Sequence, residues 1–206
     1  MAWYRCGGGG SEGKKTPQMI DSDSDFSVTQ KASYTTSHAF TLKKGDTLLV
    51  GITHRSATIT VSNDLTPIIS ATAFGNFYFS VYKKVATQDE TIQPTITNPS
   101  TNFLGSAWLQ LRDADVKVND TIVRSTASSY QETVPTPLTP FVFFCFFSTN
   151  SPIRLASEQD FVFRNGNAVN TRIAFAVNIN TNTAQSAVVN FGTSGTNQHA
   201  VAILDI

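Results

Sequence analysis

Residues 141–147 read Phe-Val-Phe-Phe-Cys-Phe-Phe, which is the longest apolar run in the chain. A strand with one solvated face alternates apolar and polar residues, but this run is apolar throughout, so we expect both faces to be covered. One face can lie inside a β-sandwich. The other requires a further segment of this chain or a neighbouring subunit, and we favour a subunit because a chain of this length has few layers to spare. The candidate interface residues are Val142, Phe144 and Phe146.

Several other stretches of the chain have the composition of β-strands. Val, Ile, Thr, Phe and Tyr dominate them, and Gly, Pro, Asn or Asp bound them, which predicts strands rather than helices. The expected strands are residues 47–53, 58–62, 77–82, 91–97 and 106–111. The polar segment 112–140 ends in a proline-containing stretch, so we expect a crossover with one or two edge strands near residues 121–124. The sequence therefore predicts an all-β protein.

The apolar positions also recur at long range. An offset of 95 residues maps Leu48 to Phe143, Val50 to Cys145, Ile52 to Phe147, Tyr78 to Ile173, Tyr82 to Val177, Ile92 to Ala187 and Ile96 to Phe191. An offset of 93 maps Ala107 to Ala200, Leu109 to Ala202 and Leu111 to Leu204. Two similar halves that each carry an apolar face are expected to pack face to face. The sequence thus predicts an antiparallel β-sandwich of jelly-roll type over residues 26–206, with repeats at about 45–111 and 140–204.

Residues 1–25 are predicted to form an arm and a linker. Trp3, Tyr4 and Arg5 precede four consecutive glycines, which make a flexible tether, so these three residues are the candidate anchor on another subunit. The alternative is a disordered terminus. The carboxylates of Asp21–Asp25 are expected in a solvated turn before the first strand, and the sequence leaves open whether they bind calcium.

Composition excludes several partners. The 15 basic and 15 acidic residues balance, whereas a nucleic-acid backbone requires a basic excess. No signal peptide is recognised at the N-terminus, and the apolar runs are too short for membrane insertion, which takes about 20 residues. Two cysteines, Cys6 and Cys145, do not make a disulfide framework, and Cys145 is expected to be a small buried apolar residue.

No motif in the chain carries enzymatic chemistry. His38, His54 and His199 lie far apart without metal-ligand spacing, with His54 expected in a loop, and the acidic residues fall at expected turns. We therefore expect no catalytic residue, no metal and no cofactor. Trp108 is expected in the core rather than on a sugar-binding platform. The candidate ligand-binding loops contain Phe74, Phe77, Tyr130, Arg164 and Asn165.

Two features resemble a known class of proteins. The opening residues 1–10 resemble the start of tail-associated and fibre-like structural proteins of phages that infect Gram-positive bacteria. The series Lys44–Val50, Phe79–Val85 and Trp108–Leu111 is similar to jelly-roll domains of phage tail appendages and some bacterial surface proteins.

This resemblance implies a structural protein of the bacteriophage virion, either a tail fibre or a head decoration protein. Such a protein is anchored to other virion proteins by its N-terminal arm, is commonly a homotrimer, and can attach to a host surface glycan. Two alternatives stay open, namely a free carbohydrate-binding module and a polysaccharide depolymerase.

Overall fold

The structure is a computed structural model. It describes residues 15–26, 32–99, 104–127, 131–136, 140–147, 154–155, 162–168, 171–179, 186–190 and 197–206. All regular elements within these ranges are strands, and each strand pairing is antiparallel, so the all-β prediction is confirmed. The Trp3–Arg5 anchor and Tyr130 lie outside the described residues.

Eighteen strands are present in this part of the chain. The first ten are β1 (Gln18–Phe26), β2 (Ser33–Thr35), β3 (Phe40–Leu42), β4 (Thr47–His54), β5 (Thr60–Val61), β6 (Thr66–Phe74), β7 (Phe77–Val85), β8 (Glu90–Ile92), β9 (Thr95–Thr97) and β10 (Gly105–Arg112). The others are β11 (Lys117–Ala127), β12 (Gln131–Pro135), β13 (Phe141–Phe147), β14 (Arg154–Leu155), β15 (Val162–Ala168), β16 (Thr171–Asn178), β17 (Ser186–Asn190) and β18 (Asn197–Asp205).

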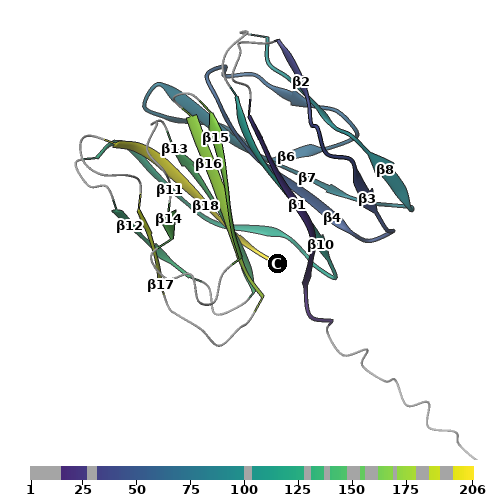
Figure 1. Cartoon of the computed structure of the whole chain (residues 1–206). Coiled ribbons are helices and arrows are strands. Elements are labelled where there is room, and N and C mark those ends of the chain that lie inside the picture. The colour runs from purple at the N-terminus through teal and green to yellow at the C-terminus, as the bar shows by residue number, and fades with distance from the viewer. Residues whose placement is uncertain are drawn as a thin grey trace, which may run out of the picture.

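Two large sheets face each other in the middle of the molecule (Figure 1). The first large sheet has the order β1-β10-β4-β7-β6, and the second has the order β11-β18-β13-β16-β15. Smaller sheets cover their outer faces: β2-β9-β5 and β3-β8 lie on the first, and β12-β17-β14 lies on the second. The sandwich therefore has four layers, where the sequence predicted two.

Three apolar cores hold these layers together. The central core joins the two large sheets and includes Leu49, Phe79 and Leu109 from one sheet and Phe144 and Ile173 from the other. The first outer core surrounds Trp108, which is fully buried, as expected from its place in an apolar strand. The second outer core lies between the second large sheet and β12-β17-β14. Side chains of β4, β10 and β13 thus pack on both faces of their sheets.

The favoured subunit interface at β13 is wrong. Val142, Phe144 and Phe146 belong to the central core, and the alternate residues Phe141, Phe143, Cys145 and Phe147 belong to the second outer core. Each of these seven residues is at most 2% exposed. Further segments of the same chain cover both faces, which was the other alternative, because β12 and β17 form a layer that the sequence repeat did not reveal.

Several strand boundaries also differ from the expectation. Residues 21–25 belong to β1, which pairs with β10, so the expected solvated turn is an edge strand. The expected strand 91–97 is divided at Gln93–Pro94, where the proline has no N–H to donate to a ladder. Of the expected strand 58–62, only Thr60–Val61 forms. The crossover 112–140 does carry two strands, β11 and β12, as expected.

The offset of 95 residues fails in β7. It pairs Tyr82 with Val177, but Tyr82 packs in the first outer core and Val177 in the central core. It also pairs Tyr78 with Ile173, although Tyr78 shares the outward face of β7 with Tyr82 and Ile173 points into the central core. An offset that is wrong by an odd number of residues assigns every side chain of the strand to the opposite face of the sheet.

Candidate functional site

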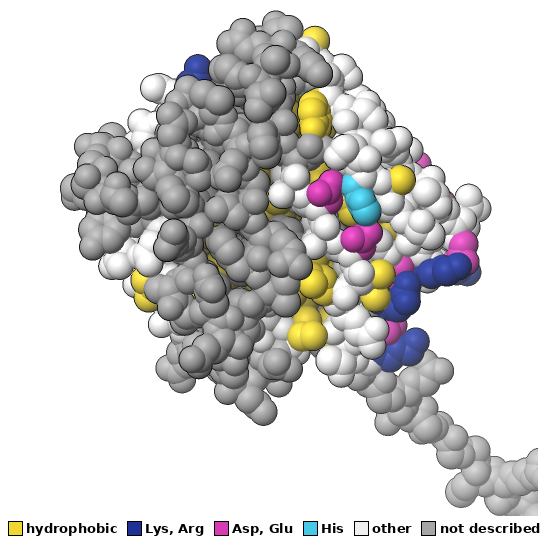
Figure 2. Space-filling model, viewed as in Figure 1, with side chains coloured by type: hydrophobic (Ala, Val, Ile, Leu, Met, Phe, Trp, Pro, Cys, Tyr) yellow, Lys and Arg dark blue, Asp and Glu magenta, His cyan; other side chains and the backbone are white. Residues whose placement is uncertain are grey.

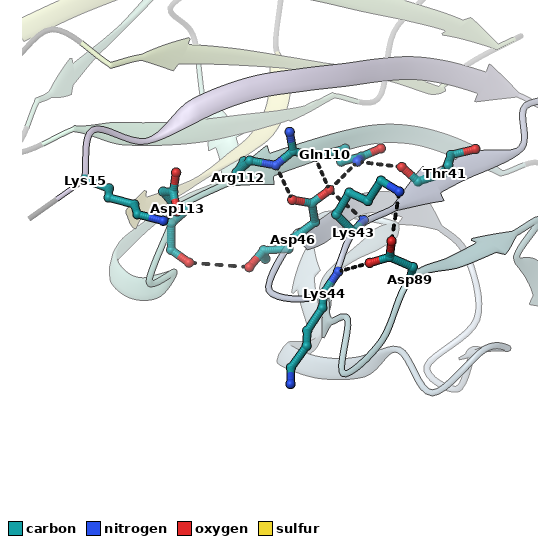
Figure 3. Close-up of polar contacts among 11 residues, drawn as sticks. Lys15, Thr41, Lys43, Lys44, Asp46, Asp89, Gln110, Arg112 and Asp113 are labelled. Carbon is teal, nitrogen blue, oxygen red and sulfur yellow. Dashed lines mark hydrogen bonds and ion pairs between the residues drawn. The ribbon is translucent and has the colours of Figure 1, made fainter.

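One polar cluster lies around the turn Lys43–Asp46 (Figure 3). The Asp46 amide donates to the Lys43 carbonyl over 2.9 Å, and Gly45 has a φ of +90°, the combination that a type II turn requires. The buried Asp46 carboxylate accepts hydrogen bonds from Arg112 Nε at 2.8 Å and Nη2 at 2.9 Å. It also accepts from Gln110 Nε2 at 2.8 Å and from the Lys43 amide at 2.9 Å.

The electrostatics of this cluster indicate a structural role. Burial alone would raise the pKa of the Asp46 carboxyl group, but the hydrogen bonds from Arg112, Lys43 and Gln110 outweigh burial and hold the pKa below its usual value. The turn is anchored again where Asp89 accepts from the Lys43 ammonium group at 2.8 Å. A carboxylate whose oxygens accept four hydrogen bonds from the protein fixes the start of β4, and we assign Asp46 no role in binding a ligand.

An open pocket of about 540 Å³ lies beside this turn, between Lys15, Gly45 and the segment that joins β10 to β11. Four of its charged groups form ion pairs: Lys15 lies 3.4 Å from Asp113, and Lys117 lies 2.6 Å from Asp115. The fifth, Asp205, accepts hydrogen bonds from Asn119 Nδ2 at 3.1 Å. On the face shown in Figure 2, charged side chains gather at the end where the described chain begins. This pocket is an open, salt-bridged surface.

A second polar cluster joins three strands of the C-terminal part. Glu132 of β12 contacts His199 of β18 at 2.8 Å and Arg124 of β11 at 3.1 Å. Burial lowers the pKa of His199, and Glu132 opposes that effect only in part. Glu132 was expected at a solvated turn, but its side chain is 11% exposed. Sequence reasoning missed this cluster because the three residues are brought together only by strand pairing.

The third site is a groove of about 310 Å³ between residues 57–60 and the outer face of β6 and β7. Hydroxyl groups of Thr58, Thr60, Ser70 and Ser80 line it, together with Ala57, Ile59, Pro67, Ala71 and Tyr82. No described residue of the lining is charged. Its size falls at the lower end of the range of small-molecule sites, about 300–1,000 Å³.

Two buried side chains fix the wall of this groove. His54, expected in a loop, is buried at the end of β4, donates from Nδ1 to the Ser56 carbonyl at 2.6 Å and accepts at Nε2 from the Ser80 hydroxyl at 3.0 Å. Burial lowers the pKa of His54 to about 4, so the ring is neutral near pH 7 and this tautomer follows from its two partners. The Tyr82 hydroxyl donates to the Ile59 carbonyl at 2.8 Å.

The residues expected in ligand-binding loops do not form one site. Phe74 and Phe77 are buried in the central core, because only Gly75 and Asn76 turn the chain between β6 and β7. Gly75 has a φ of +58°, as the first central residue of a two-residue type II′ hairpin requires. Arg164 and Asn165 were also placed in a loop, but they lie in β15, where they pair with Phe175 and Ala174.

No cluster of three metal-ligating side chains occurs among the described residues. Likewise, this part of the chain contains no helix long and apolar enough to cross a membrane. Comparison with known proteins found no matching family model, no matching curated protein and no matching solved structure.

Proposed function

We propose that this chain is a structural, non-catalytic component of a phage virion, an appendage or decoration protein anchored by its N-terminal arm. The observation that carries the proposal is the central core. It packs the first large sheet with its covering sheets (the first sandwich) against the second large sheet with its covering sheet (the second sandwich), so the described residues form one body. A rigid body suits a protein that presents a surface at a distance from its anchor. The resemblance of residues 1–10 to phage tail proteins supports the anchoring role.

We further infer that the two sandwiches are jelly-roll-type copies of one unit. The orders β1-β10-β4-β7-β6 and β11-β18-β13-β16-β15 correspond strand by strand, as do β2-β9-β5 and β12-β17-β14. Register supports the same correspondence. Leu49 lies opposite Leu109 and Phe144 lies opposite Ala202, so offsets of 95 in β4 and 93 in β10 reproduce the pairing.

Irregularities of the strands agree with the duplication as well. The register of β1 shifts between Met19 and Asp21, and that of β11 shifts between Val118 and Asp120. Both shifts occur against corresponding positions of the neighbouring strands: Leu111 and Gln110 of β10, and Leu204 and Ile203 of β18. Bulges at matched places in two edge strands favour descent from one unit over chance, because bulges are retained within families.

The proposal is tested on particles. If the chain is a virion component, mass spectrometry of phage particles purified from the source strain finds it, and antibodies against the β-sandwich body label one defined place on them. A chain that begins at Lys15 keeps β1 but lacks Trp3, Tyr4 and Arg5, and it should fail to join the particle. Absence of the protein from purified particles contradicts the proposal.

Light scattering tests the trimer that the resemblance implies. Because β13 is covered by its own chain, a trimer has to form through other surfaces or through the arm. A full-length trimer that becomes a monomer when the chain begins at Lys15 places the contact in the arm. A monomer in both forms removes the trimer from the proposal and leaves a decoration protein.

A further inference from the structure

We propose that the groove between residues 57–60 and strands β6 and β7 binds a neutral glycan. This inference rests on the proposed function, because it names the class of ligand that the β-sandwich body would bind on a host surface. The groove differs from the loops that the sequence indicated, since Phe74 and Phe77 point into the central core. Three observations carry the proposal: a fixed wall, an uncharged hydroxyl lining, and a half-exposed aromatic ring on the same face of the sheet, next to the lining.

The wall of the groove is held in place before any ligand binds. His54 connects the Ser56 carbonyl to the Ser80 hydroxyl, and Ser56 Oγ donates to the Thr58 carbonyl at 2.9 Å. Tyr82 ties Ile59 to β7. Binding therefore does not have to order this segment, and a preorganised site loses less conformational entropy when the ligand arrives.

The lining selects for an uncharged ligand rich in hydroxyl groups. Thr58, Thr60 and Ser70 are exposed, and each hydroxyl can donate one hydrogen bond and accept others. Sugar hydroxyls have the same capacity. An anionic glycan would place carboxylate or phosphate groups where no described lining residue carries a positive charge, so it would lose hydration without a charged partner.

Tyr82 is the aromatic residue in the lining of the groove, and Tyr78, outside that lining, supplies a further aromatic surface on the same face of the sheet. Tyr78 precedes Ser80 by two residues in β7, so the two side chains point to the same side. Tyr78 is half-buried and its ring stacks on His54 with centroids 6.0 Å apart, which fixes the ring. An aromatic ring held in this way offers an apolar face against which the apolar face of a sugar can pack.

The second sandwich provides an internal comparison. Thr60 pairs with Thr97 and Arg154 pairs with Asn190 at corresponding places of β9 and β17, so Arg154 is the counterpart of Thr60. Gly51 lies opposite Val81 and Phe146 lies opposite Ile173, which makes Arg172 the counterpart of Ser80.

Two neutral residues of the groove lining, Thr60 and Ser80, thus have arginine counterparts in the second sandwich, whereas the core pairs Leu49/Phe144 and Leu109/Ala202 are apolar in both. The uncharged lining is therefore a property of the first sandwich and not of the shared fold. We expect a neutral glycan to bind to the first sandwich alone.

The test uses full-length protein on an array that carries neutral and anionic oligosaccharides. The neutral members contain glucose, galactose, rhamnose or N-acetylglucosamine, and the anionic members contain uronic acid or glycerol phosphate. Thr60→Arg and Ser70→Arg each place a charge in the groove at an exposed position. Thr41→Arg is the matched control, because Thr41 is an exposed strand threonine on β3, outside the groove.

We expect the wild-type protein and Thr41→Arg to bind the same neutral oligosaccharide. Both groove variants should weaken that binding by about tenfold or more, because a ligand that cannot pair the new charge would bury it. Failure of every neutral oligosaccharide to bind, or equal binding by Thr60→Arg, Ser70→Arg and Thr41→Arg, overturns the proposal. Detection of the protein on phage particles is independent of this result, so failure of the glycan site leaves the virion role standing.

Discussion

Gly51 shows how one residue sets the distance between the two large sheets. A Cβ atom at this position would lie 2.5 Å from Phe144 Cδ1 and 3.0 Å from Ile173 Cδ1, both in the opposite sheet. The absence of a side chain in β4 therefore makes room for a phenylalanine of β13. Glycine weakens a strand on its own, but here it permits close packing of the central core.

Gly51→Val should destabilise the whole protein. The added side chain overpacks the central core, which typically lowers the free energy of unfolding by about 1–3 kcal/mol. Thermal and urea unfolding measure the change. Combining it with Phe144→Leu should recover part of the loss, because the smaller side chain makes room. Additive effects of the two substitutions would show that residues 51 and 144 do not touch.

At the scale of elements, the Lys43–Asp46 turn sets the start of β4. We expect Asp46→Asn to lower the free energy of unfolding by about 2–3 kcal/mol, because the buried group loses its charge-assisted hydrogen bonds to Arg112. Asp89→Asn removes a partner of the same turn whose side chain is 61% exposed, so it should cost much less stability than Asp46→Asn. Equal losses in denaturant unfolding would contradict this account of the turn.

The lowered pKa of Asp46 predicts that the protein loses stability in acid. The pKa of Asp46 is lower in the folded protein than its ordinary value of 3.8, so the unfolded chain takes up the proton first. Its contribution to stability is present above pH 3.8 and is lost as the pH falls through the folded pKa. Acid unfolding of Asp46→Asn should therefore show a shallower dependence on pH below 4 than wild type, and identical slopes would contradict the assignment.

His54 links β4, β7 and the wall of the groove, and its titration tests that link. The folded pKa of about 4 lies below the usual 6.5, so between these values the unfolded chain binds a proton that the folded protein does not. The stabilising contribution of the neutral His54 ring is therefore complete above pH 6.5. The free energy of unfolding falls by about 3 kcal/mol as the pH drops to 4. NMR of the His54 Cε1 proton should give a midpoint near pH 4. A midpoint near 6.5 would show that the ring is solvated.

Sequence periodicity predicted the elements whose side chains alternate or are apolar throughout. It located β4, β7, β10 and β13, and it placed Trp108 in the core. It failed at β1, because the alternating Asp and Ser residues 21–25 have no apolar face and read as a turn. An edge strand needs no apolar residues along its free edge, and charged residues there protect against pairing with other chains.

The candidate site could be predicted less well than the fold. Aromatic residues beside glycine suggested a loop at Phe74 and Phe77, but a two-residue turn keeps both side chains in the strands and in the core. The groove residues Thr58, Thr60 and Ser70 are common strand residues with no motif. Only pairing of β5 with β9, and packing of that sheet on β6 and β7, brings them together.

At the scale of the whole molecule, the four layers depend on one shared interior. Each large sheet places one face in the central core and the other in its own outer core. Strand β15 lies against β1 and β10, and β11 lies against β6, so each large sheet also meets the other at its edges. Separating the two sandwiches would expose Phe79, Phe144 and Phe146 to water, at about 25 cal/mol for each Å² of apolar surface.

Differential scanning calorimetry of the full-length protein is the most direct test of this shared core. If the two sandwiches form one body, they unfold together in a single transition whose calorimetric and van't Hoff enthalpies have a ratio of about one. Gly51→Val should then shift the entire transition to lower temperature. Two separable transitions, only one of which moves with Gly51→Val, would show that the sandwiches are independent domains and would contradict the account.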